Sequence, residues 1–153
     1  MNAPLDWSVI PQALPFLAQG MLLSLGLLAA SLLGGLALGI VLALMRLSSN
    51  RVISLIAGVY VSIFRSIPLV LAIFWLYLLV PLLVEVIRGS STPIGPMYSA
   101  FIAFVVFEAA YFCEVIRAGI QSIRPGQTSA ALALGMTKMQ AMRHIVLPQA
   151  LRV

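Results

Sequence analysis

Three long apolar stretches alternate with short polar segments along the chain. They cover residues 16–45, a second region within residues 52–84, and residues 97–116. No charged residue occurs from Trp7 to Met45, a run well beyond the roughly 20 apolar residues with which a helix crosses a bilayer. A segment in lipid must satisfy its backbone hydrogen bonds internally, so each stretch is expected to be helical. The pattern predicts an all-α membrane protein, a helical bundle with three spans.

The charges indicate how these spans are oriented. Charged residues make up 8% of the chain, against about 25% in a soluble domain. The N-terminal tail carries Asp6 and no Lys or Arg, whereas the first loop carries Arg46 and Arg51. Cytoplasmic loops collect Lys and Arg, which predicts an N-terminus outside and a C-terminus inside. Five further cations follow or end the third stretch: Arg117, Arg124, Lys138, Arg143 and Arg152.

The net charge of +5 also raises the question of nucleic acid as a partner. The cations follow the membrane topology, so no nucleic-acid partner is expected. Enzymatic chemistry is equally unexpected. Asp6, His144 and Cys113 are the sole residues of their types, and the predicted topology puts Asp6 and His144 on opposite sides of the membrane. Cys113 lies in an apolar stretch and is expected to pack there, without a disulfide or a metal cluster.

Small residues recur every four positions in the first span, at Ser31, Gly35, Gly39 and Ala43. Such a stripe lets another helix approach closely, so we predict a packing seam. The alternative is composition alone, because Gly and Ala are common in membrane helices.

The second stretch contains Arg65, whose depth the sequence leaves open. A helix that enters the hydrocarbon near Leu55 would put Arg65 about 15 Å deep. In the other arrangement, the span covers residues 66–84 and Arg65 extends outward to the cytoplasmic face. Pro68 disfavours helical geometry at Ile67, which predicts a kink or break there.

The third stretch contains Glu108, which lies 11 residues beyond Met97 and hence about 16 Å deep. A carboxylate at that depth needs a partner, a proton or a water-filled path. Three alternatives remain open: a contact with Arg65, a place in the lining of a substrate path, or unrelated roles for the two residues. Glu114 and Arg117 are spaced i, i+3 and are predicted to form an ion pair that anchors the helix end.

Residues 124–150 predict a helix, a turn and a second helix just inside the membrane. The Ala-rich residues 127–134 favour helix, and Gly135 suits its C-terminal end. Thr137 and Gln140 have the spacing of a capping box at the start of the next helix. Such an element either seats in a groove on a partner or lies as an amphipathic helix on lipid, and physics alone does not separate these.

Several sequence motifs, which follow one another along the chain, resemble those of the permease subunits of bacterial ABC importers. Residues 126–136, followed by residues 145–150, are similar to the cytoplasmic "EAA" loop of that family. The phrases at residues 45–49, 64–69, 107–111 and 114–123, together with the opening at residues 6–8, resemble the polar amino acid branch, and most of all the glutamate/aspartate importers. Ser129 stands where the general family has Glu, a feature that the glutamate/aspartate branch shares.

The resemblance implies a multi-pass subunit of the type I ABC importer permease kind in the bacterial inner (plasma) membrane, importing an amino acid such as glutamate or aspartate. Its partners would be an ABC ATPase, a second permease subunit (the same chain or a sister chain) and a periplasmic amino acid-binding protein. The implied ATPase-docking residues are Gln127, Ser129, Ala130, Ala131 and Gly135, and Arg65 and Glu108 would line the transport path or its gate.

No Gly-x-x-x-x-Gly-Lys-Ser/Thr phrase occurs, so ATP and Mg²⁺ are expected on the separate ATPase, with no cofactor or metal in this chain. Family members continue past the Leu147-Pro148 motif through further helices, so the chain looks like the N-terminal two-thirds of a permease. Two other functions remain: a small membrane scaffold that recruits a cytoplasmic partner, and a permease fragment that does not transport.

Overall fold

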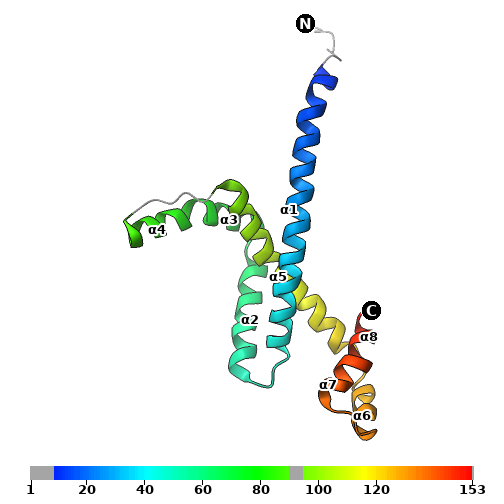
Figure 1. The fold of residues 1–153 in the computed structure, drawn as a ribbon. Helices are drawn as coiled ribbons and strands as arrows, with labels where there is room; N and C mark the ends of the chain where they lie inside the picture. Colours follow the sequence, from blue (N-terminus) through cyan, green and yellow to red (C-terminus); the bar gives the residue numbers. More distant parts are fainter. Residues whose placement is uncertain (1–8, 90–94, 153) are drawn as a thin grey trace.

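The computed structural model describes residues 9–89 and 95–152, and this part of the chain contains helices and no strands (Figure 1). The phrase at residues 6–8 and most of the predicted second loop lie outside the described residues. The elements in chain order are α1 (Val9–Arg46), α2 (Arg51–Ser66), α3 (Leu69–Phe74), the π-helical η1 (Trp75–Leu79), α4 (Val80–Arg88), α5 (Pro96–Gln121), α6 (Pro125–Ala133), α7 (Lys138–Ala141), the π-helical η2 (Met142–Val146) and α8 (Leu147–Ala150).

The long helix α1 forms the axis of the molecule. Helix α2 returns beside its lower half as an antiparallel hairpin, and α5 crosses α1 in that same half (Figure 1). The turn between α1 and α2 lies at the same end of the molecule as α6, α7 and α8, opposite the N-terminus (Figure 1). The positively charged segments predicted to be cytoplasmic are therefore gathered at one end.

Three segments are long and apolar enough to cross a membrane: Val9–Arg46, Leu69–Ile87 and Pro96–Gln121. The predicted all-α fold with three segments able to span a membrane is confirmed. The first helix begins seven residues before the predicted start at residue 16. Its 38 residues correspond to roughly 57 Å, which exceeds the hydrocarbon thickness.

The region of residues 52–84 is divided at Ile67, so the predicted kink or break is confirmed. Ile67 has φ −101° and ψ 135°, because Pro68 excludes the helical conformation of the preceding residue. The chain therefore breaks between α2 and α3, and the apolar span begins at Leu69. Arg65 lies in the last turn of α2, four residues before that span and at the end of α2 farthest from the turn that joins α1 to α2.

The core lies where α1 meets α5, along the predicted seam of small residues. Ser31, Gly35, Gly39 and Ala43 are all buried. A Cβ atom on Gly35 would lie 2.5 Å from the Cβ of Glu108, and one on Gly39 would lie 2.6 Å from the Cβ of Phe112. Glycine is therefore the only residue at these two positions that lets α1 and α5 approach this closely without moving apart, and the packing seam is confirmed.

Helix α2 completes this core from the other side. Ala57 and Val61 pack with Leu42, Ala110 and Cys113 in one buried cluster. The cysteine is fully buried, as expected for a packing role. The Tyr60 hydroxyl donates to the Val106 carbonyl at 2.9 Å, which ties α2 to α5 by a polar contact as well.

Candidate functional site

A cavity of about 440 Å³ lies between the break after α2 and the middle of α5. The chain break at Pro68 forms one wall, since a helix ending there leaves a gap beside α5. Its lining combines one cation, one carboxylate and several aromatic rings: Arg65, Ser66, Ile67, Pro68, Leu69, Phe104, Phe107, Glu108 and Tyr111.

Arg65 and Glu108 share this cavity without forming an ion pair. The ion pairs of the described chain all involve Glu114, so the direct Arg65–Glu108 contact considered from the sequence is wrong. The Arg65 guanidinium instead lies 5.6 Å from the centre of the Tyr111 ring, within cation–π distance. Both charges therefore face the same space while remaining separate from each other.

Glu108 also borders a second cavity of about 290 Å³ on the α1 side of α5. Ser24, Ser31 and Phe104 line this space together with the carboxylate. Because the Cβ of Glu108 packs on Gly35, the seam with α1 fixes its backbone between the two cavities. Glu108 therefore borders one space that Arg65 lines and another that Ser24 and Ser31 line.

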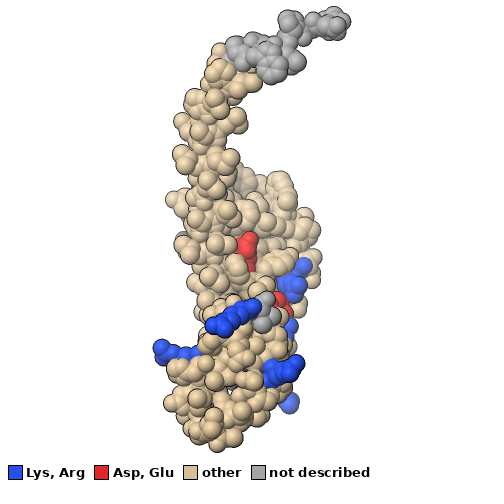
Figure 2. All heavy atoms as spheres, turned by 90° about the vertical axis from the view of Figure 1, so that its right-hand side faces the viewer, with Lys and Arg blue, Asp and Glu red and all other residues tan. Residues whose placement is uncertain are grey.

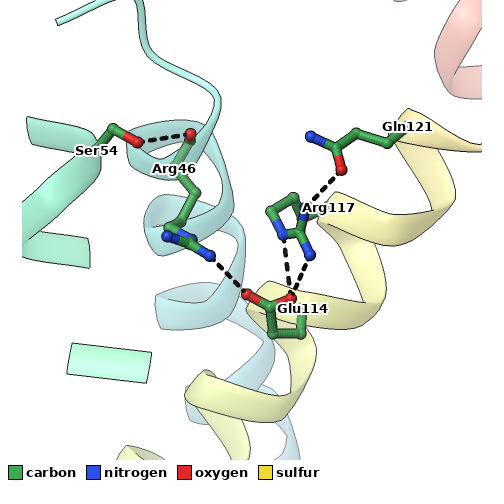
Figure 3. Close-up of polar contacts among 5 residues, drawn as sticks. All are labelled: Arg46, Ser54, Glu114, Arg117 and Gln121. Atoms are coloured by element: carbon green, nitrogen blue, oxygen red, sulfur yellow. Dashed lines mark hydrogen bonds and ion pairs between the residues drawn. The ribbon is translucent and has the colours of Figure 1, made fainter. Parts of the chain in front are cut away.

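Below these cavities, Glu114 joins α1 to the end of α5 (Figure 3). Its Oε2 accepts hydrogen bonds from Arg117 Nη2 at 2.7 Å and Nε at 3.0 Å, which is the pair expected from the i, i+3 spacing. Its Oε1 accepts from Arg46 Nη2 at 3.3 Å. The sequence did not predict the contact between Arg46 and Glu114, because 68 residues separate the two and no local pattern links them.

Arg46 reaches this carboxylate by crossing α2 at Gly58. A Cβ atom on Gly58 would lie 2.5 Å from Arg46 Nη1, so a side chain there would displace the guanidinium. The Arg46 carbonyl also accepts a hydrogen bond from Ser54 Oγ at 3.0 Å (Figure 3). One residue thus connects α1, α2 and α5 close to the point where α5 leads into α6.

The segment after α5 folds as a helix–turn–helix unit whose turn is set by Gly135. This residue has φ +84°, a left-handed conformation that glycine adopts at little cost. The Met136 amide donates to the Ala131 carbonyl and the Gly135 amide to the Leu132 carbonyl, which is the Schellman pattern at a helix end. The predicted helix end at Gly135 is confirmed.

The predicted capping box follows directly. The Gln140 amide donates to Thr137 Oγ1 at 3.3 Å, and the Thr137 amide donates to Gln140 Oε1 at 2.8 Å. A hydrogen bond from Gln149 Nε2 to Gln127 Oε1 at 3.5 Å links the two arms. Residues 125–150 thus form a small folded unit.

Most of the predicted docking residues are exposed on this unit. Gln127, Ser129, Ala130 and Gly135 are exposed. Ala131 differs, because only 3% of its surface is accessible. Its small side chain serves the internal packing of the unit and is not available on the surface of this chain.

Two large apolar side chains on either side of the turn were not singled out from the sequence. Leu134 is 81% exposed and Met139 is 75% exposed. Their position beside the turn at Gly135, one before it and one after it, was the signal that would have found them. Lys and Arg side chains also gather toward this end of the molecule, whereas the upper part of α1 shows none (Figure 2).

Comparison with known proteins gives consistent matches. Residues 35–153 match the model of the family described as the binding-protein-dependent transport system inner membrane component. The glutamate/aspartate import permease protein GltK of Escherichia coli O6:H1 is 49% identical over 148 residues, which cover 96% of this chain and 66% of GltK. The arginine transport system permease protein ArtQ of Bacillus subtilis is 38% identical over 97% of this chain and 65% of its own length.

The fold also matches a solved structure. A crystal structure of an amino acid ABC transporter with histidines superposes with a TM-score of 0.85 at 31% sequence identity, covering 98% of this chain and 67% of the other. The chain thus spans about two-thirds of the length of the relatives that it matches.

Proposed function

Because the chain belongs to the binding-protein-dependent transport system inner membrane component family, we propose that it is a permease subunit of an ATP-driven amino acid importer. The observation that carries this proposal is the direct connection between two sites. Helix α5 bears the Glu108 cavity in its middle and, after a three-residue linker, continues into the exposed helix–turn–helix unit. A force applied to that unit would therefore act on a wall of the cavity.

The substrate class that we propose is glutamate and aspartate. The 49% identity to a permease with that name supports it. The cavity offers the Arg65 guanidinium and the Glu108 carboxylate on different parts of its lining, which suits a ligand that carries both signs of charge. Arg65 alone does not select acidic substrates, because any amino acid carries an α-carboxylate.

The partner that we propose for residues 125–150 is a separate ABC ATPase, which would bind ATP and Mg²⁺. Gln127, Ser129, Ala130 and Gly135 would form the contact surface, and Leu134 and Met139 would enter apolar pockets of the ATPase. Burying a large apolar side chain is worth roughly 1.5–3 kcal/mol, so these two residues would supply much of the affinity.

The remaining partners would be a second permease subunit, identical or a sister chain, and a periplasmic amino acid-binding protein. The protein would be a multi-pass component of the bacterial inner membrane. The exposed apolar side chains along α1 and α4 support contact with lipid or with neighbouring helices.

The test is reconstitution of the native protein with its ATPase and binding protein in liposomes. ATP-dependent glutamate uptake that aspartate inhibits and arginine does not would support the proposal. Leu134→Gln and Met139→Gln should reduce both ATPase binding and uptake. ATPase binding without uptake would favour the scaffold, and the absence of both would favour a fragment that does not transport.

A further inference from the structure

A third hollow lies away from both of these sites, at the tip of the hairpin formed by α1 and α2. This hairpin groove has a volume of about 590 Å³ and is open to the outside. Its lining includes Arg46, Arg51, Leu55, Gly58, Val59 and Ile63. None of the functions proposed above uses this groove.

One end of the groove is polar and positively charged. Arg46 and Arg51 stand there with Ser48 and Ser49, and none of the lining residues is acidic. The Arg46 guanidinium donates from Nη2 to Glu114, while its Nη1 lies beside Gly58, another residue of the groove lining. Arg51 is exposed at the first turn of α2, where the helix dipole also favours an anion.

The other end of the groove is an apolar stripe. Leu55, Val59 and Ile63 follow one another at four-residue spacing and are 66%, 49% and 48% exposed. The stripe runs about 12 Å along α2, away from the arginines. A soluble anion would use only the charged end and leave this stripe uncovered.

We propose that the hairpin groove binds an anionic phospholipid, with its phosphate at Arg46 and Arg51 and an acyl chain along Leu55, Val59 and Ile63. Basic pockets between membrane helices on the cytoplasmic side suit such headgroups, and the charge of the groove is complementary to them. Since Arg46 also holds Glu114 on α5, the bound headgroup would brace the hairpin against the helix that leads into α6.

The experiment is native mass spectrometry of the native protein, extracted in detergent and titrated with phosphatidylglycerol or with zwitterionic phosphatidylethanolamine. Phosphatidylglycerol should be retained more strongly. Arg51→Gln should weaken its binding about fivefold, the effect of about 1 kcal/mol per arginine near an anionic surface. Leu55→Gln should also weaken it, because the acyl contact is lost.

Arg143→Gln is the matched control, since it removes the same charge from an exposed position outside the groove. Equal losses for Arg143→Gln and Arg51→Gln would overturn the proposal in favour of diffuse attraction. Complete displacement by millimolar inorganic phosphate, with no effect of Leu55→Gln, would overturn it in favour of a soluble-anion site. Cross-linking of a photoreactive group at position 55 to protein instead of lipid would overturn it by showing that another helix covers the groove.

Discussion

At the residue scale, Glu108 is the carboxylate residue that lines both cavities. The backbone of α5 holds it against Gly35, and its carboxylate borders both cavities. We expect Glu108→Gln to lower substrate uptake by roughly tenfold, a barrier increase of about 1.4 kcal/mol, because the charge that faces the substrate is removed. Initial rates of uptake in proteoliposomes measure this effect.

Glu85→Gln is the control for that experiment. Glu85 is exposed on α4 and lines neither cavity, so its neutral variant should transport at the wild-type rate. Equal rates for the two variants would show that Glu108 has no part in the path.

Gly39 determines how closely α1 and α5 approach. A methyl group there meets the Cβ of Phe112 and the Ala109 carbonyl, so Gly39→Ala should destabilise the protein by about 1–3 kcal/mol through overpacking. Thermal unfolding in detergent should show a lower Tm. Gly26→Ala is the matched control, since nothing lies near its added methyl group and its Tm should not fall. A similar Tm for both variants would contradict the role of the seam.

These residue-scale features differ in how far the sequence predicts them. The stripe of small residues is periodic, and its periodicity identifies the buried face of α1 without knowledge of the partner helix. The Arg46–Glu114 contact has no such pattern, because it depends on how two distant helix ends meet across Gly58. The burial of Ala131 likewise depends on the return of the chain over α6.

At the scale of elements, the two π-helical turns share one cause. The residue before Pro81 donates its amide to the carbonyl five residues earlier, and so does the residue before Pro148. A proline ring clashes with the carbonyl four residues back, and the wider turn relieves that clash. The sequence indicates a disturbance at each proline, but it does not distinguish a break, as at Pro68, from a widened helix.

The turn between α6 and α7 depends on the left-handed conformation of Gly135. Gly135→Val forces a β-branched residue into a left-handed conformation, which costs at least about 1–2 kcal/mol and should open the Schellman turn. We expect co-purification of the ATPase with the native permease to fall about tenfold or more.

Gly126→Val provides the comparison within the same unit. A Cβ atom on Gly126 would meet no other atom within 4 Å, and the residue has no left-handed φ, so the same substitution should leave ATPase binding nearly unchanged. Undiminished co-purification of the Gly135→Val protein would refute the docking assignment. Capping residues make this unit predictable from sequence, whereas the exposure of Leu134 and Met139 depends on which face the fold leaves uncovered.

At the scale of the whole molecule, charge and shape together predict the orientation in the membrane. The α1–α2 turn and α6–α8 lie at one end, with the N-terminus of α1 at the other (Figure 1). If the positive end is cytoplasmic, as the distribution of Lys and Arg predicts, position 95 at the start of α5 faces outward, and positions 49 and 139 face inward.

Single cysteines at these sites distinguish the two orientations, because the native Cys113 is fully buried and contributes little background. In intact spheroplasts, an impermeant maleimide should label Gly95→Cys and should label Ser49→Cys and Met139→Cys only after the membrane is opened. Labelling of all three from outside, or the reverse pattern, would contradict the predicted topology. It would also remove the coupling proposal, since an ATPase reaches α6–α8 only from the cytoplasm.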